Sequence, residues 1–544
     1  MNSPNPALVS QRAVQRLPRL ALLLLCAAYV LPGIFGRDAW KNADIIAVGY
    51  MRSLAHGDAS WLSPSIAGLV SDNGLLPYWL GALSMQALPW LDPSIAARLP
   101  FALLLSALLA LLWYAAYHLA RTEAAQPLAF AFGGEAQPTD YARAIADAAL
   151  LALIATLGLL QLGHETTPEL VQLAACTLYL YALAVSPFRA TKARVATLIS
   201  LPVLAASGAA TTAVLLGIAG SVVCLRSSFT GARDLARWIG ASALLALLVA
   251  TGLDAWAWRV DRPEKALGLA RLLIWFPWPT LPLAAWTVWR WRHHLLHRHL
   301  SIPLVSAGVA LVVSLSMGGS DRALMLALPG LAVLAAFALP TLQRSVSAAI
   351  DWFSVFFFSL CALSIWVIYL AMQTGTPPKI AANVARLAPG FVAHFSVPEL
   401  IAAVLGTLAW LWLVRWRTGR HRHALWKSMV LPAAGVVLNW LLLMSLWLPL
   451  LDYARSYRPL IERLSRHLPA QVCVLAPQLT HSQLAALEVM GRWRVERRDS
   501  RRCDWQVSSV PLGTEPQMLP GWRLVVRERR PADREETWVV YRRL

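Results

Sequence analysis

The sequence predicts an all-α polytopic membrane protein that ends in a small domain of helices and strands outside the membrane. Three observations carry this prediction. Of the 544 residues, 58% are hydrophobic and only 14% are charged, whereas soluble globular domains have roughly 25% charged residues. Apolar stretches of nearly span length recur along the chain, each long enough to cross about 30 Å of hydrocarbon. Many of the 25 tryptophans lie near the ends of these stretches, as in the aromatic belts of membrane proteins.

Thirteen apolar stretches are predicted to be transmembrane helices. The first has no small-residue cleavage site and is followed by many more, so we expect a retained helix rather than a removed signal peptide. A further apolar segment, 74–90 (GLLPYWLGALSMQALPW), is predicted to be a juxtamembrane or re-entrant helix that does not cross. The predicted spans are 18–36, 95–119, 143–162, 167–186, 193–207, 209–225, 237–256, 271–290, 301–317, 322–341, 350–372, 398–415 and 427–449.

Clusters of basic residues give the predicted orientation. The net charge is +19, and the basic residues fall mostly in short gaps between the spans, which the positive-inside rule places in the cytoplasm. All the basic clusters fall on one side of the membrane only if 74–90 does not cross it. The N-terminus is therefore predicted to be cytoplasmic and the C-terminus extracytoplasmic. The sequence has no nucleic-acid-binding motif, and we attribute its basic charge to topology and to contact with anionic lipids.

The composition changes at about residue 450. We predict a transmembrane domain over 1–449, with a long first outer loop at 36–94, and a separate α/β or α+β domain over 450–544. This last part alternates short apolar strands with a helix and turn residues. Cys473 and Cys503 are its only cysteines; in an oxidising compartment they form either a disulfide or two free thiols. The remaining cysteines lie in or beside spans and are predicted to be packing residues: Cys26, Cys176, Cys224 and Cys361.

With this orientation, the polar chemistry gathers on the outer side of the membrane. Acidic residues lie in the 36–94 loop, in the HETTPE turn at 164–169 and in the GGSDR turn at 318–322. The predicted cytoplasmic loops are basic and contain no Walker A or other nucleotide-binding motif, which argues against cytosolic nucleotide as the energy source. Four histidines on that side have no acid or cysteine paired with them, so no metal site is predicted there: His293, His294, His297 and His299.

Asp44 has two interpretations from the sequence pattern alone. The segment 43–57 has helical periodicity, with Ile46, Tyr50 and Leu54 on one face and Asp44 in the first turn. A carboxylate at this position stabilises the N-terminus of a helix by its charge. A carboxylate held beside the bilayer surface can also take a proton from an incoming hydroxyl group.

Several segments together resemble the GT-C glycosyltransferases, and among these the bacterial lipid A aminoarabinose transferase and protein O-mannosyltransferase family. The run GRDAWKNADIIAVGYMRSLAHGDASWLSPSIAG, followed by NGLLPYWLGAL, resembles the opening of that family, with Asp44 as its first-loop acid. HETTPELVQLAACTLYLYAL resembles its second acidic turn. SDRALMLALPGLAVLAAFALP resembles the entry to a late span, with Arg322 in the basic position. The order and sidedness of these motifs extend the resemblance over nearly the whole chain.

The resemblance implies an inverting transferase at the periplasmic face of a bacterial inner membrane. The implied donor is a polyprenyl-phosphate sugar, and the acceptor is a lipid A-like lipid, a glycan or a protein; no cofactor, metal or nucleic acid is expected. Asp44 and Glu165 are the implied catalytic carboxylates. Cations that stabilise the leaving phosphate are sought among Arg259, Arg262, Lys265, Arg271, Arg322 and His164. Acceptor or groove residues are sought among Lys41, Tyr78, Trp79 and Glu169.

Other interpretations of these residues stay open. Thr167, Pro168 and Glu169 are also typical of an ordinary helix start, with threonine as cap and proline in the first turn. The basic segment 259–271 also suits contact with phosphate headgroups. The whole chain is alternatively a lipid-linked-sugar transporter or a structural membrane component. The concentration of acids at one surface favours an enzyme, because transporters place ionisable groups near the middle of the membrane.

Overall fold

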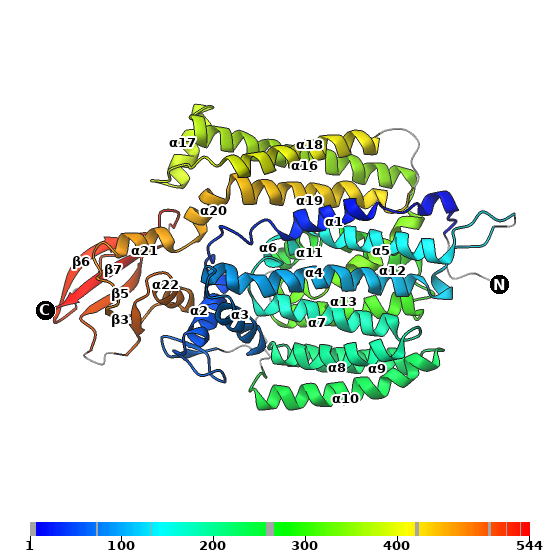
Figure 1. Cartoon of the computed structure of the whole chain (residues 1–544), viewed down its shortest axis with the longest axis horizontal. Helices are drawn as coiled ribbons and strands as arrows, with labels where there is room; N and C mark the ends of the chain where they lie inside the picture. Colours follow the sequence, from blue (N-terminus) through cyan, green and yellow to red (C-terminus); the bar gives the residue numbers. More distant parts are fainter. Residues whose placement is uncertain are drawn as a thin grey trace. The chain divides into compact units, whose positions relative to one another are not determined.

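The structure is a computed structural model that describes residues 7–71, 74–130, 132–256, 266–418, 424–498, 502–517, 519–533 and 535–544. It is mostly helical (Figure 1). The chain divides into two compact units. The first unit comprises Met1–Pro32, Phe101–Ala362 and Ala402–Leu442, and the second comprises Gly33–Pro100, Leu363–Ile401 and Leu443–Leu544. Four helices contain a boundary between the units: α4 (Pro93–Ala120), α16 (Arg344–Thr374), α18 (Val397–Thr418) and α19 (Lys427–Leu446).

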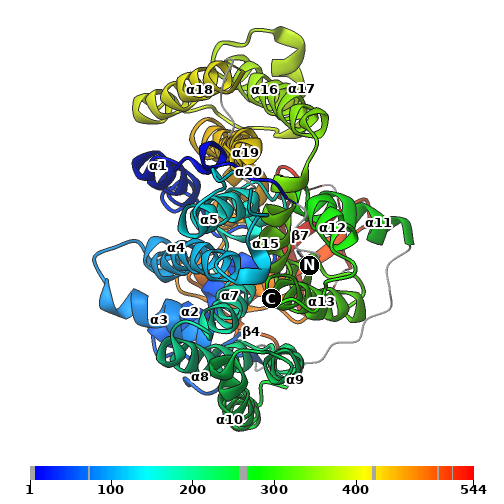
Figure 2. The same cartoon turned by 90° about the vertical axis from the view of Figure 1, so that its right-hand side faces the viewer.

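The first unit is a bundle of helices that lie side by side when viewed end on (Figure 2). Its elements are η1 (Gln11–Val14), α1 (Arg19–Val30), η2 (Glu123–Ala125), α5 (Pro138–Ile154), α6 (Leu159–Leu162), α7 (Pro168–Val185), α8 (Ala190–Ala206), α9 (Ala210–Leu225), α10 (Thr230–Gly252), α11 (Ala266–Trp275), α12 (Thr280–Arg290), α13 (Arg298–Ser316), α14 (Asp321–Met325), α15 (Leu328–Ala338) and η3 (Leu339–Thr341).

Helix α15 forms the core of this bundle. Every one of its residues is buried, and it packs against α5, α12 and α13. Its sequence, LPGLAVLAAFA, is rich in small residues, which allow helices to approach closely where hydrophobic burial alone does not drive them together. A methyl group on Gly330 would lie 2.5 Å from the carbonyl oxygen of Pro303 on α13. Glycine is therefore required at this contact.

Each of the thirteen predicted spans overlaps at least one helix. Among the described residues, seven helices are long and apolar enough to cross a membrane. Four predicted spans are interrupted: 143–162 is divided into α5 and α6, 271–290 into α11 and α12, 322–341 into α14, α15 and η3, and 427–449 into α19 and the start of α20 (Leu448–Arg455). Proline explains the second and third of these breaks because it cannot donate a backbone hydrogen bond, and Pro277, Pro279 and Pro329 lie at those junctions. The count of thirteen crossings and the orientation stay predictions.

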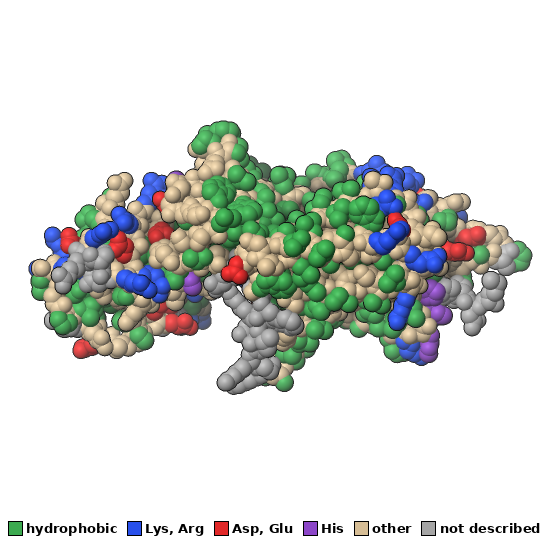
Figure 3. Space-filling model, turned by 90° about the horizontal axis from the view of Figure 1, so that it is seen from below, with side chains coloured by type: hydrophobic (Ala, Val, Ile, Leu, Met, Phe, Trp, Pro, Cys, Tyr) green, Lys and Arg blue, Asp and Glu red, His purple; other side chains and the backbone are tan. Residues whose placement is uncertain are grey.

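The segment 74–90, predicted not to cross, contains α3 (Leu76–Ala87). This helix has 12 residues, as many as α1 in the first predicted span, so its length does not decide whether it crosses and its not crossing stays a prediction. Hydrophobic side chains cover much of the flank of the helical part, whereas lysine and arginine gather at its end on the right of the view (Figure 3). This distribution is the one expected for helices surrounded by lipid.

The second unit combines the first long loop with the C-terminal residues. This grouping differs from the predicted domain division at residue 449, because the 36–94 loop joins the C-terminal part in one compact unit. Arg52 donates to the carbonyl oxygen of Glu488 at 3.0 Å, and the Glu488 carboxylate accepts from the backbone N–H of Ala67 at 3.0 Å. The elements that precede the C-terminal sheet are α2 (Ala43–Ala55), β1 (Ser65–Ile66), β2 (Leu69–Val70), α3, α17 (Pro378–Leu387), α20 (Leu448–Arg455) and α21 (Arg458–Leu464).

The predicted C-terminal sheet is confirmed as five strands in the order β4-β3-β5-β7-β6. Strand β3 runs parallel to β4 and β5, and β7 runs antiparallel to β5 and β6. A helix connects β3 to its parallel neighbour β4, as parallel strands require a crossover. The bounds are β3 (Cys473–Leu475), α22 (His481–Val489), β4 (Arg494–Glu496), β5 (Trp505–Pro511), β6 (Trp522–Glu528) and β7 (Glu536–Arg543).

Cys473 and Cys503 are joined by a disulfide in this sheet. Cys473 begins β3 and Cys503 precedes β5, so pairing of these neighbouring strands brings the two cysteines together. Their Cα atoms are 4.7 Å apart, within the range of about 4.4–6.8 Å that disulfides span. Glu496 lies beside the two sulfur atoms and completes the only group with metal-ligand spacing among the described residues. The disulfide already uses both thiolates of that group.

We predict that four of the six cysteines react with an alkylating reagent when the purified protein is denatured without reductant. Cys473 and Cys503 should react only after reduction, because a disulfide has no thiolate to act as nucleophile. Intact-mass measurement before and after reduction counts the added groups directly. Cys26, Cys176, Cys224 and Cys361 are free and serve as internal controls. Six additions without reductant would rule the bridge out.

Candidate functional site

Asp44 lies in the first turn of α2, at the end of a tight entry to the helix. Asn42, at the N-cap, has a positive φ of 74° and no side-chain capping bond. The Asp44 carboxylate instead accepts the backbone N–H of Trp40 at 3.3 Å and pairs with the Arg37 guanidinium at 3.3 Å. Both charged side chains are fully buried, with 1% and 0% exposure. Asp44 is therefore half of a buried ion pair rather than a simple helix cap.

The surroundings of this pair are aromatic and acidic. The guanidinium groups of Arg37 and Arg455 lie 4.8 Å and 4.9 Å from the centroid of the Trp40 ring. Its indole N–H donates to Asp452 at 2.7 Å, and the backbone N–H of Asp38 also donates to Asp452 at 3.3 Å. Burial raises the pKa of Asp452 to about 6, although the hydrogen bond from Trp40 opposes that rise.

Arg98 adds a second buried cation to this part of the second unit. It lies in the first turns of α4, is 2% exposed, and donates to the carbonyl oxygens of Arg37 and Ile34. Its Nε and Nη2 have no hydrogen-bond partner within the described ranges. A buried arginine is costly unless its charge is balanced. Asp44, Asp38 and Asp452 are the acids whose charges act on it.

The predicted acceptor or groove residues of this unit have mixed surroundings. Tyr78 is buried, with its ring centroid 5.0 Å from that of Tyr50. Trp79 donates its indole N–H to the carbonyl oxygen of Trp61 at 2.7 Å. Both aromatic residues thus have structural contacts of their own, whereas the side chain of Lys41 is exposed. Their part in substrate binding stays a prediction.

The second acidic turn belongs to the first unit and is built around Arg322. Arg322 donates to Glu165 at 2.6 Å, to Glu169 at 3.4 Å and to the Thr167 hydroxyl at 3.3 Å. Gln161 donates to the second oxygen of Glu165 at 2.9 Å. Thr167 and Pro168 do occupy the N-cap and the first turn of α7, but the threonine side chain forms no capping bond.

The arrangement combines one cation with two carboxylates, so its local charge is negative when all three are ionised. Glu165 is almost completely buried, whereas a quarter of the Arg322 side chain is exposed. Arg322 belongs to the short helix α14. This helix is capped by Ser320, whose side chain accepts from the backbone N–H of Ala323 at 3.3 Å. The predicted phosphate-binding arginine and catalytic glutamate are thus direct partners.

His164 lies next to this turn and holds it against two helices of the same unit. Its Nδ1 is 2.7 Å from the carbonyl oxygen of Leu160, and its Nε2 is 2.8 Å from that of Tyr29 at the end of α1. The ring also packs on Trp440 of α19, with centroids 4.5 Å apart. Both ring nitrogens therefore lie within hydrogen-bond distance of a backbone carbonyl oxygen.

Of the remaining predicted phosphate-binding residues, Arg271 lies exposed on α11. Arg259, Arg262 and Lys265 lie outside the described residues. Sequence reasoning also missed three residues around Asp44, namely Arg37, Arg98 and Asp452. The signal for Arg98 was available, because an arginine inside a predicted span is rare and marks a functional or structural role. Asp452 had no comparable signal.

Solved structures with a similar fold are known. Over 96% of both chains, the structure matches ArnT, the lipid A aminoarabinose transferase, from Cupriavidus metallidurans bound to undecaprenyl phosphate, with a TM-score of 0.59 and 14% sequence identity. The chain has the ArnT fold. The apo form of the same protein gives a TM-score of 0.60 at 15% identity, again over 96% of both chains. The resemblance to GT-C glycosyltransferases is thereby confirmed at the level of the fold.

A second solved structure matches less well. The oligosaccharyltransferase of Archaeoglobus fulgidus, tethered with an acceptor peptide, gives a TM-score of 0.42 at 12% identity and covers 89% of this chain and 64% of its own. No model of a protein family matches the sequence, and no curated protein matches it either. The ArnT fold is therefore known here from the structure and not from sequence kinship.

Proposed function

We propose that this protein is an integral membrane glycosyltransferase that uses a polyprenyl-phosphate sugar. The observation that carries the proposal is the ArnT fold, because the match extends over 96% of both chains and one matched structure contains undecaprenyl phosphate. We place the reaction at the periplasmic face of a bacterial inner membrane, with a lipid A-like lipid, a glycan or a protein as acceptor. The buried acid in the first long loop supports this proposal, since the chemistry requires a carboxylate near the acceptor.

In the proposed reaction, the acceptor hydroxyl oxygen attacks the anomeric carbon of the donor sugar. The bond from that carbon to the phosphate oxygen breaks, polyprenyl phosphate leaves with the electron pair, and the anomeric configuration is inverted. Asp44 takes the hydroxyl proton, and Arg37 holds its carboxylate in place. Arg322 and His164 stabilise the charge that develops on the leaving phosphate, while Glu165 positions Arg322. Asp44 and Arg322 belong to different units, and each role rests on its own local geometry.

The experiment that tests the function compares cells with and without the protein. Mass spectrometry of lipid A, glycans and periplasmic proteins should reveal one class of molecule that loses a sugar residue when the protein is absent. Purified protein with a polyprenyl-phosphate sugar and that acceptor should restore the modification in vitro. Loss of the modification in cells together with no transfer by purified protein would instead favour a lipid-linked-sugar transporter.

We predict the orientation from the same argument. A reporter that is active only in the periplasm should be active when fused after Leu544 and when inserted near Gly375, in the turn between α16 and α17. The same reporter inserted near Thr418 should be silent, because that position adjoins a basic cluster expected in the cytoplasm. Activity at Thr418 would overturn the thirteen-span topology and require 74–90 to cross the membrane.

A further inference from the structure

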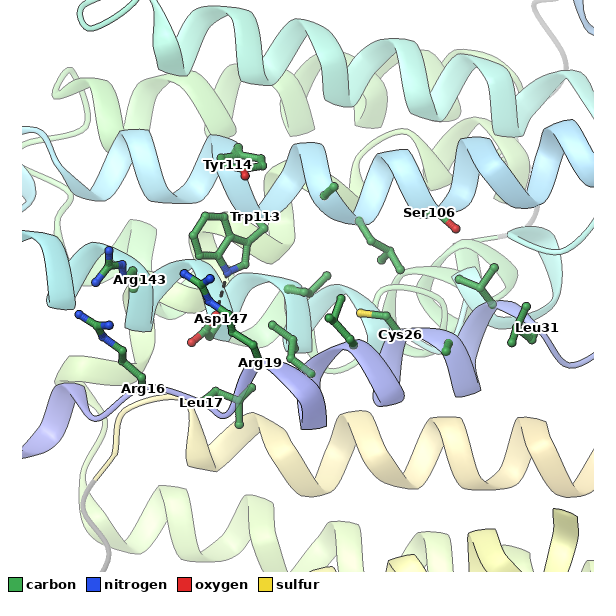
Figure 4. Close-up of a pocket in the computed structure, with 17 residues that line it drawn as sticks. Arg16, Leu17, Arg19, Cys26, Leu31, Ser106, Trp113, Tyr114, Arg143 and Asp147 are labelled. Carbon is green, nitrogen blue, oxygen red and sulfur yellow. Dashed lines mark hydrogen bonds between the residues drawn. The ribbon is translucent and has the colours of Figure 1, made fainter. Parts of the chain in front are cut away.

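A cavity in the first unit lies among α1, α4 and α5 (Figure 4). Its volume is about 650 Å³, within the range of roughly 300–1,000 Å³ that is usual for small-ligand sites. Most of its wall is aliphatic, and the residues that form this wall include Leu22, Leu23, Ala27, Val30, Leu109 and Ala110. An apolar cavity of this size on a membrane-spanning bundle has the chemistry to hold a hydrocarbon chain.

One end of the cavity is polar. Figure 4 shows Arg16, Arg19 and Arg143 gathered at that end, whereas Cys26 and Leu31 lie toward the other. The cavity therefore presents cations at one end and hydrocarbon along the rest of its length. This polarity matches an amphiphile whose headgroup is negatively charged.

The charges at the polar end can be summed. Asp140 pairs with both Arg16 and Arg143, each at 3.3 Å. Asp147 is buried and accepts the Trp113 indole N–H at 2.7 Å. Arg19 is exposed and forms no ion pair within the described part of the chain. The cavity wall has three arginines and Asp147. Asp140, which does not line the cavity, pairs with two of these arginines, so one positive charge is left in excess.

This end of the cavity is distinct from the acidic turn around Arg322. Arg19 begins α1, and Tyr29, whose carbonyl oxygen faces His164, lies near the other end of that helix. Ten residues of helix separate the two by about 15 Å along the axis. A ligand headgroup beside Arg19 would therefore lie far from the proposed donor-phosphate residues.

We propose that this cavity binds a glycerophospholipid of the phosphatidylglycerol type. Its phosphate diester lies among Arg16, Arg19 and Arg143, and one acyl chain follows the apolar wall between α1 and α4. A phosphate diester with an uncharged headgroup carries one negative charge, which balances the single excess positive charge. A phosphate monoester such as polyprenyl phosphate carries about −1.5 to −2 at neutral pH, and a zwitterionic lipid leaves the excess charge unbalanced. The proposal is independent of the proposed enzymatic function.

Native mass spectrometry of the purified full chain tests this proposal. After delipidation, titration with phosphatidylglycerol should show one tightly retained lipid, and phosphatidylcholine with the same acyl chains should bind more weakly. Arg19→Gln should reduce the affinity for phosphatidylglycerol about five-fold, as expected for one basic residue at an anionic headgroup, and should leave phosphatidylcholine unaffected. Ala110→Phe, which fills the cavity, should reduce retention of both lipids. Arg233→Gln is the matched control, because Arg233 is exposed on α10 and does not line the cavity.

Three results would overturn the proposal. The first is equal affinity for the two lipids, and the second is equal loss of phosphatidylglycerol in Arg19→Gln and Arg233→Gln. The third is displacement of phosphatidylglycerol by polyprenyl phosphate from the site that Ala110→Phe closes, which would assign the cavity to the donor. Arg19 is exposed, so its substitution is expected to leave folding intact. The comparison of Arg19→Gln with Arg233→Gln therefore tests the proposal even if Ala110→Phe fails to fold.

Discussion

Replacing Asp44 with asparagine is expected to lower the rate of sugar transfer by about 10²–10⁴-fold, the usual contribution of a general base. Asparagine keeps the shape of the side chain and its ability to accept the Trp40 N–H, but it cannot take a proton at neutral pH. The rate should be measured with purified protein and a polyprenyl-phosphate sugar. This loss should persist across the whole pH range in which the protein is folded.

Folding must be separated from chemistry in this experiment. The Asp44–Arg37 pair is fully buried, and removing one partner of such a pair typically costs about 3–5 kcal/mol because the other charge is left unbalanced. Asp44→Asn is therefore expected to melt at a lower temperature as well. A simple helix cap predicts no such loss, since asparagine caps about as well as aspartate.

Two further variants complete the design. Arg37→Gln leaves the Asp44 carboxylate in place without the charge of Arg37, so transfer should persist with its pH optimum moved upward, because the acid then gives up its proton less readily. The double variant Arg37→Gln with Asp44→Asn removes both charges and should regain much of the lost stability without regaining transfer. A double variant that is both stable and active would show that Asp44 is structural, and Glu165 would be the next residue to test.

The helical part of the fold could be predicted because apolar length is a local property of the sequence. Every predicted span overlaps a helix, yet the breaks near Pro277 and Pro329 divide two of them. Hydrophobicity averaged over a window of residues does not detect such breaks, although the backbone helix is interrupted there. The alternation of charge predicts that segment 74–90 does not cross the membrane; the structure confirms a helix there, and its not crossing stays a prediction.

The contacts of the candidate sites could not be predicted in the same way. Trp40 and Asp452 are 412 positions apart in the sequence, and Glu165 and Arg322 are 157 apart. No periodicity relates residues at such distances, and only tertiary packing brings them together. The same limit explains the domain division, since the loop at 36–94 joins the C-terminal part through pairs such as Ala67 and Glu488. The disulfide was open to prediction only because two cysteines were available.

The second large effect is expected from Arg322→Gln. This variant should weaken binding of polyprenyl phosphate and lower transfer by about 10²–10³-fold, comparable to the loss of one preorganised group that stabilises the transition state. It also leaves Glu165 and Glu169 without their shared cation, so two negative charges would face the incoming phosphate. The measurement combines steady-state transfer with direct binding of polyprenyl phosphate.

Substituting Glu165, the ion-pair partner of Arg322, separates an effect on donor binding from an effect on folding. Glu165→Gln is therefore compared with Arg322→Gln. Glutamine keeps the bond from Gln161 within reach but frees Arg322 from its closest carboxylate, at 2.6 Å. If Glu165 positions Arg322 for the leaving group, kcat should fall while the affinity for polyprenyl phosphate is kept or rises. Arg290→Gln, an exposed arginine at the end of α12, is the charge-matched control and should change neither kcat nor the affinity for polyprenyl phosphate.

Normal donor binding by a folded Arg322→Gln variant would exclude Arg322 from the phosphate site. The ion pair would then be a structural tie between α7 and α14, and the phosphate would have to be bound by other cations such as Arg271.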